Sequence, residues 1–67
     1  MEMIGHVTAY LGYGQYEVLC PDAPEHLRSL ILTWRQLLGA AVGDRVRLKY
    51  QVTASSGLWN AVEILTP

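Results

Sequence analysis

The segment RVRLKYQV, residues 45–52, alternates strictly between polar and apolar side chains. One face would carry Val46, Leu48, Tyr50 and Val52, and the other Arg45, Arg47, Lys49 and Gln51. Strict alternation over eight residues predicts a half-buried β-strand. The same period of two recurs over residues 5–11 and 15–20. Residues 27–32 and 58–65 are predicted as two further strands, with Val62 and Ile64 expected to point inward in the last one. The pattern therefore predicts an all-β chain of five strands.

The length of 67 residues allows a single domain, residues 1–67, with a thin core. A chain of this size buries only about 60% of the surface that it exposes when unfolded. Cys20 is the only cysteine, so an internal disulfide is excluded, and neither histidine has a partner at the spacing of a metal site. We therefore expect no metal and no cofactor. No apolar run approaches the roughly 20 residues of a membrane span, and the start lacks the features of a signal peptide, so a cytoplasmic protein is expected.

Turn residues divide the alternating segments, and one segment departs from the period of two. Thr33 and Gln36 have the spacing of a helix capping box, and Gly39 suits a helix end. One or two helical turns are therefore predicted within residues 34–39. Five strands with one short helical turn after the third match a small antiparallel OB-fold barrel. An SH3-like barrel, which also has five short strands, is the alternative.

The corner LGYGQYEVL, residues 11–19, places Tyr13 between two glycines. Glycine permits backbone angles that other residues avoid, so the chain can turn sharply here and display the tyrosine ring. The alternative is a tight turn whose tyrosine covers one end of the barrel. Trp34 presents the same choice between a stacking surface and a plug for the core. Trp59 is interpreted as hairpin packing or as part of an aromatic rim with Tyr10.

The charges are unevenly distributed although the net charge is only −1. All five cations lie between residues 28 and 49, where Asp44 is the only acid. One face of a small domain can therefore be basic, but a strongly basic nucleic-acid binder is not expected. The row of cations on the predicted strand 45–52 suits either contact with phosphates or an ordinary solvated face.

Several short motifs resemble those of the cold-shock domain, a nucleic-acid-binding OB-fold of about this length. The resemblance covers the whole chain and rests on Gly5-His6-Val7 with Tyr10, on residues 11–16 and 30–34, on Gly43-Asp44-Arg45-Val46, and on residues 61–64. The segment 43–46 also resembles bacterial translation initiation factor one. The family's first ribonucleoprotein-type motif begins with lysine and carries a second aromatic, where this chain has Leu11 and Gln15. Its second motif has an aromatic and a histidine where this chain has Ile31 and Thr33.

The resemblance implies a single-stranded nucleic-acid-binding protein, for RNA or DNA, that stacks bases on Tyr13 and Trp34. The expected binding residues are Tyr13, Trp34, Tyr10, His6, Thr8, Arg28, Arg35, Arg45, Arg47 and Lys49. The alternative is a non-catalytic interaction or assembly module, with a second copy or another protein as its partner and no membrane contact. No nucleophile triad, phosphate-binding loop or metal motif is visible, so we do not expect an enzyme.

Overall fold

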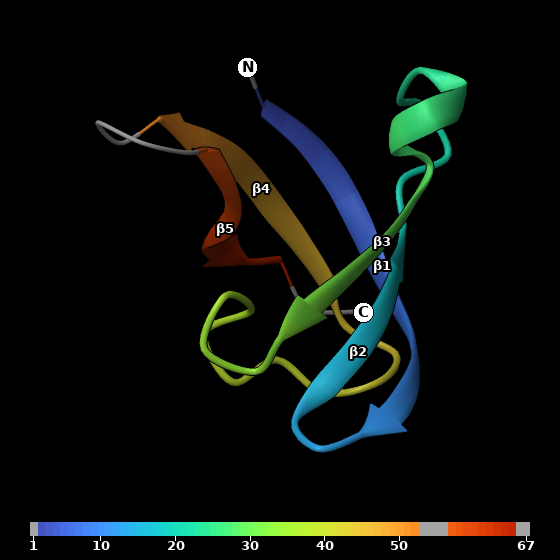
Figure 1. Cartoon of the computed structure of the whole chain (residues 1–67), viewed down its shortest axis with the longest axis vertical. Coiled ribbons are helices and arrows are strands. Elements are labelled where there is room, and N and C mark those ends of the chain that lie inside the picture. The colour runs from blue at the N-terminus through green and yellow to red at the C-terminus, as the bar shows by residue number, and fades with distance from the viewer. Residues whose placement is uncertain (1, 53–56, 66–67) are drawn as a thin grey trace.

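The computed structural model describes residues 2–52 and 57–65, which form five β-strands and one short 3₁₀ helix. The elements are β1 (Glu2–Gly12), β2 (Gln15–Leu19), η1 (Glu25–Leu27), β3 (Ser29–Thr33), β4 (Arg45–Val52) and β5 (Gly57–Ile64). The strands make one antiparallel sheet in the order β3-β2-β1-β4-β5, which curls around a common interior (Figure 1). The predicted all-β class is therefore confirmed. The part of the chain that the structure describes contains no helix that could span a membrane.

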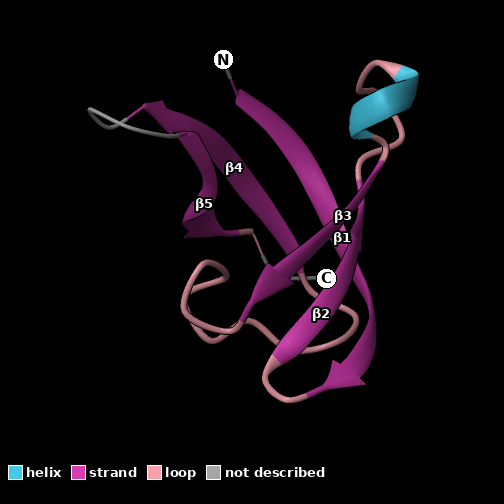
Figure 2. Cartoon of the chain, in the orientation of Figure 1, coloured by secondary structure: helices cyan, strands magenta, loops and turns pink. Residues whose placement is uncertain are grey.

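The core is built from the inward face of the curled sheet and from the loops at its ends. Its buried members are Val7, Val18, Cys20, Ala23, Leu32, Leu37, Ala40, Val46, Leu48, Trp59 and Ala61. In β4 the alternation behaves as predicted at Val46 and Leu48, which are fully buried. Tyr50 and Val52 on the same face are 41% and 77% exposed. Tyr50 lies opposite the buried Trp59, and Val52 lies opposite Gly57 at the end of the β4–β5 hairpin, which projects from the rest of the sheet (Figure 2).

The last strand differs from the prediction because of a β-bulge. The pairing of β4 with β5 shifts between Arg47, which faces Glu63, and Leu48, which faces Ala61. Val62 is left without a partner and is 39% exposed, so its predicted inward position is wrong. Trp59 and Ala61 fill the core instead, as the hairpin-packing interpretation of Trp59 requires.

The segment after β3 forms hydrogen-bonded turns and not the predicted helix. The capping box itself is present: the Thr33 N–H donates to Gln36 Oε1 at 2.9 Å, and the Gln36 N–H donates to Thr33 Oγ1 at 3.4 Å. One i to i+4 bond follows, from the Leu37 N–H to the Thr33 carbonyl. The chain then leaves the helical path because Leu38 and Gly39 both have positive φ, 57° and 79°. The short helix that is found among the described residues, η1, precedes β3.

The two edge strands are linked through this turn. Among the described residues β3 and β5 share no strand pairing, so closure of the barrel by a β3–β5 ladder is not observed. Gln36 makes the connection: its carbonyl accepts the Ala61 N–H at 2.6 Å, and its Nε2 donates to the Trp59 carbonyl at 3.0 Å. The turn therefore covers the edge of β5 and holds it near the end of β3.

Candidate nucleic-acid interface

The β1–β2 corner is a two-residue hairpin that displays Tyr13. Gly12 pairs with Gln15, and the loop residues Tyr13 and Gly14 have φ of 54° and 74°. Positive φ at both loop positions defines a type I′ turn, which favours Asn or Gly at the position that Tyr13 occupies. The Tyr13 side chain is fully exposed, at 102% of its reference surface. Neither packing nor backbone preference accounts for a tyrosine at this position.

Trp34 lies against the same corner. Its backbone N–H donates to the Gly14 carbonyl at 2.9 Å, which continues the β2–β3 ladder by one residue. A Cβ on Gly14 would lie only 2.9 Å from Trp34 Cδ1, so the absence of a side chain at Gly14 makes room for the indole. Trp34 remains 52% exposed and is therefore not a core plug.

Arg35 adds the positive charge of this end. Its Cζ lies 5.3 Å from the centre of the Trp34 ring, within the range of a cation–π contact. A guanidinium held beside an exposed indole offers both a stacking surface and a charge for a phosphate. The pair depends on the capping box, because Trp34 and Arg35 lie between its two members, Thr33 and Gln36.

Tyr10 and Tyr16 form a cross-strand pair next to the β1–β2 hairpin loop. Their rings lie 4.9 Å apart at 54°, and Tyr10 Oη accepts the Gly14 N–H at 3.1 Å. Tyr10 is 56% exposed, and its hydroxyl reaches the loop that carries Tyr13. We call Tyr10, Tyr13, Tyr16, Trp34 and Arg35 the aromatic end. Tyr16 is a further residue of this site that was not expected from the sequence; a two-residue hairpin loop with a bulge at its base brings it opposite Tyr10.

His6 and Thr8 do not join the aromatic end. The pairing of β1 with β2 shifts between Val7 and Ala9, so Thr8 is the extra residue of a bulge. The Thr8 hydroxyl donates to two oxygens of Glu17, the backbone carbonyl at 3.2 Å and Oε1 of the side chain at 2.9 Å. The bulge resets the alternation and moves Tyr10 to the other face of the sheet. The expected face shared by His6, Thr8 and Tyr10 is therefore wrong.

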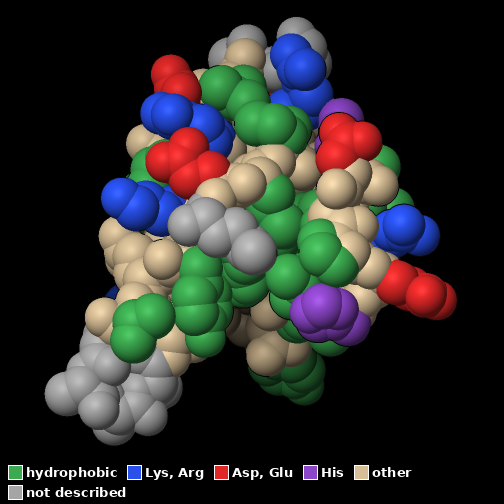
Figure 3. Space-filling view, turned by 90° about the horizontal axis from the view of Figure 1, so that it is seen from above, with side chains coloured by type: hydrophobic (Ala, Val, Ile, Leu, Met, Phe, Trp, Pro, Cys, Tyr) green, Lys and Arg blue, Asp and Glu red, His purple; other side chains and the backbone are tan. Residues whose placement is uncertain are grey.

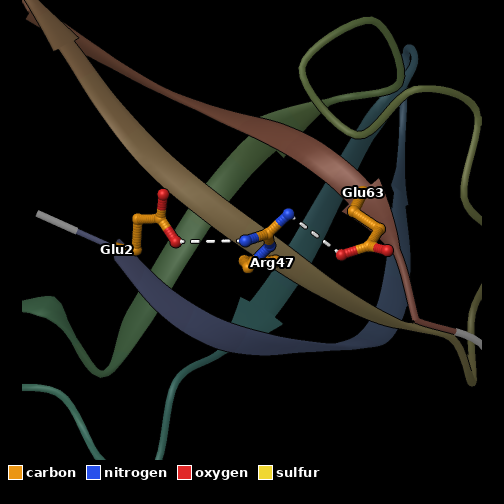
Figure 4. Close-up of polar contacts among 3 residues, drawn as sticks. All are labelled: Glu2, Arg47 and Glu63. Atoms are coloured by element: carbon orange, nitrogen blue, oxygen red, sulfur yellow. Dashed lines mark hydrogen bonds and ion pairs between the residues drawn. The ribbon is translucent and has the colours of Figure 1, made fainter.

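The three cations of β4 share the outer face, but they do not make a basic stripe. Arg47, in the middle, forms ion pairs with Glu2 at 3.4 Å and with Glu63 at 3.0 Å (Figure 4). Lys49 faces Glu2 in the β1–β4 register, and Arg45 faces His6. The two carboxylates offset the charge of Arg47, which favours the solvated-face interpretation for the middle of this row.

Arg28 lies at the opposite end of the sheet from Tyr13. Its carbonyl accepts the Cys20 N–H just beyond the end of β2, and its Nε donates to the Ala23 carbonyl at 3.0 Å. Figure 3 looks onto this end, where the Lys and Arg side chains lie beside Asp and Glu side chains and form no continuous basic surface. Arg28 is therefore separated from the aromatic end by the length of β2.

The outer face of β2 and β3, which binds ligands in many OB-folds, carries no aromatic side chain here. Its cross-strand pairs are Gln15 with Thr33, Glu17 with Ile31, and Leu19 with Ser29.

Burial raises the pKa of the Cys20 thiol, which disfavours the reactive thiolate. Among residues 2–52 and 57–65, no three His, Cys, Asp or Glu side chains are grouped in a way that could hold a metal ion.

Comparison of the chain with protein-family models, with curated proteins and with solved structures returns no match.

Proposed function

We propose that this protein binds single-stranded RNA or DNA by stacking bases on its aromatic end. The observation that carries the proposal is Tyr13, a fully exposed ring on a left-handed residue at a hairpin tip. Left-handed backbone at a residue other than glycine costs roughly 1–2 kcal/mol, and such residues cluster at functional sites. An exposed ring contributes little to folding, so a binding role explains its presence at this position.

The arrangement of the other rings supports stacking of more than one base. Trp34 is seated beside Gly14, next to Tyr13 in the chain, and Tyr10 bonds to the same glycine. Every base has a flat face, so such a surface accepts nucleotides with little sequence preference, at about 1–3 kcal/mol per base. Arg35 supplies a charge at this surface. A cytoplasmic location, where single-stranded RNA is available, would suit this function.

The charge distribution supports weak binding with a shallow salt dependence. The net charge is −1, and Arg47 is already paired with two glutamates. Each phosphate contact to a single strand lowers the logarithm of the affinity by about 0.7 per tenfold increase in salt. With Arg35 as the main contact, we expect a slope near that of a single phosphate and affinity in the micromolar range or weaker.

The test is a titration with short oligothymidine and oligouridine, followed by tryptophan fluorescence. Trp34 is half exposed and Trp59 is buried, so quenching would report mainly on the aromatic end. Tyr13→Ala should lower the affinity about tenfold or more, while the thermal midpoint stays within a few degrees of the parent.

Leu58→Ala is the matched control, because Leu58 is 52% exposed on β5, outside the aromatic end. This variant should bind like the parent. No detectable quenching in the parent at millimolar oligonucleotide would contradict the proposal and favour the interaction-module alternative. The same holds if Tyr13→Ala unfolds the protein, since the tyrosine would then serve the core.

A further inference from the structure

The edge strand β3 directs part of its backbone away from the sheet. The backbone N–H of Trp34 donates to the Gly14 carbonyl, and the Arg28 carbonyl accepts the Cys20 N–H. The backbone N–H and C=O groups of the even-numbered residues of this strand therefore point toward β2. In an antiparallel ladder the residues between them direct their N–H and C=O groups to the other side. These are Ser29, Ile31 and Thr33.

The end of β3 near the turn is covered by the chain itself. The Thr33 N–H donates to Gln36 Oε1, and the Thr33 carbonyl accepts the Leu37 N–H at 3.1 Å. No hydrogen bond among the described residues engages the corresponding groups of Ser29 and Ile31. Two residues of the edge are therefore open to a further strand.

The open edge lacks the features that usually protect an edge strand. The sequence of β3 is SLILT, without a charge, a proline or a glycine. Ile31 is 64% exposed at its centre. On the other edge of the sheet, by contrast, the backbone of β5 is already bonded to Gln36. The protein therefore presents one uncharged edge that is able to pair.

We propose that a second copy of this chain adds to this edge, so that two β3 strands pair antiparallel about a two-fold axis at Ile31. The sequence SLILT is nearly palindromic. In this register Ser29 faces Thr33 of the second copy, Leu30 faces Leu32, and Ile31 faces Ile31. Every cross-strand pair is hydroxyl with hydroxyl or apolar with apolar, and such pairs stabilise a sheet. An isologous contact of this kind closes after two copies.

The hydrogen bonds follow from the directions of the free groups. Each Ile31 N–H would donate to the Ile31 carbonyl of the other copy, giving two bonds at the axis. The Ser29 N–H would donate to the Thr33 carbonyl opposite, which has a second lone pair. A contact of five residues lies at the small end of protein interfaces, below roughly 1,200 Å². The dimer should therefore form only as the concentration rises.

The test is sedimentation equilibrium from micromolar to millimolar protein, with amide hydrogen exchange at both limits. The average mass should rise from the 7.5 kDa of the monomer toward twice that value. Exchange at the Ile31 amide should slow with concentration, while the Leu30 and Leu32 amides, which face β2, are protected throughout.

Ile31→Pro removes the outward N–H without touching a bond to β2, and Ile31→Lys places two like charges at the axis. Both should remain monomeric, and Val52→Lys, which charges an exposed position on β4, should dimerise like the parent. If Ile31→Pro fails to fold, Ile31→Lys decides. A mass of 7.5 kDa at all concentrations, or a dimer that persists in Ile31→Lys, would overturn the proposal. Self-association with an unchanged Ile31 amide would also overturn it, because another surface would then be in use.

Discussion

At the scale of single residues, Tyr13 is the position where a substitution should change nucleic-acid binding and stability in different ways. Its neighbours Gly12 and Gly14 were the visible signal, and both adopt the positive φ that the sequence suggested. The sequence did not show that Tyr13 itself would have φ of 54°, because the hairpin register depends on which residues of β1 and β2 pair. A tyrosine is a poor choice for this backbone and a good choice for stacking.

Replacing Tyr13 with asparagine should therefore stabilise the fold and weaken binding in the same molecule. Asparagine tolerates left-handed backbone, and the lost ring buries little surface, so the free energy of unfolding should rise by about 0.5–1 kcal/mol. Urea denaturation measures this change, and oligonucleotide titration measures the loss of affinity. A loss of stability of more than about 1 kcal/mol would show that the ring packs on the domain.

At the scale of elements, the strands were predictable and their irregularities were not. The alternation around Val46 and Leu48 marked a strand with a buried face, and those two side chains are fully buried. The bulges at Thr8 and Val62 left no recognisable mark in the sequence, because a bulge is set by how two strands pair. For the same reason the ion pairs of Arg47 with Glu2 and Glu63 were not foreseen, since they join three strands.

The turn after β3 shows how local and tertiary signals combine. The capping box forms as the residues indicated, but the helix stops within one turn. Gln36 bonds to Thr33 and to Trp59, and its backbone carbonyl accepts the Ala61 N–H. The bonds to β5 could not be expected from the sequence, because they join Gln36 to residues 23 or more positions away in the chain.

Gln36→Ala should destabilise the protein by about 1–2 kcal/mol, because it removes a capping interaction and a bond that links the sheet edges. It should also loosen the position of Trp34 and so weaken oligonucleotide binding. Gln15→Ala, an exposed glutamine on β2, is the control and should change stability by less than about 0.5 kcal/mol. Thermal denaturation of both variants decides, and equal midpoints would rule out the linking role of Gln36.

At the scale of the whole molecule, the two ends of the sheet differ in character. The aromatic end gathers three tyrosines, Trp34 and Arg35, whereas Arg28 lies at the end near η1. The sequence placed these cations in one basic window, residues 28–49. The fold separates them, because β3 carries the chain from one end to the other between residues 29 and 33.

This separation predicts unequal effects of two otherwise similar substitutions. Arg35→Gln should weaken oligonucleotide binding and flatten its salt dependence by about 0.7 in the logarithmic slope. Arg28→Gln removes the same charge at the other end and should leave the slope unchanged. Titrations of both variants at several salt concentrations make the comparison, and equal slopes would indicate that binding is not localised at the aromatic end.

The most direct measurement is an NMR titration of the ¹⁵N-labelled protein with a short single-stranded oligonucleotide. The indole N–H of Trp34 and the amides of Tyr10, Tyr13, Gly14 and Arg35 should shift together with a common affinity. The indole N–H of the buried Trp59 and the amides around Arg28 should stay in place. Absence of any shift, or shifts confined to the outer faces of β2 and β3 or of β4, would contradict binding by the aromatic end.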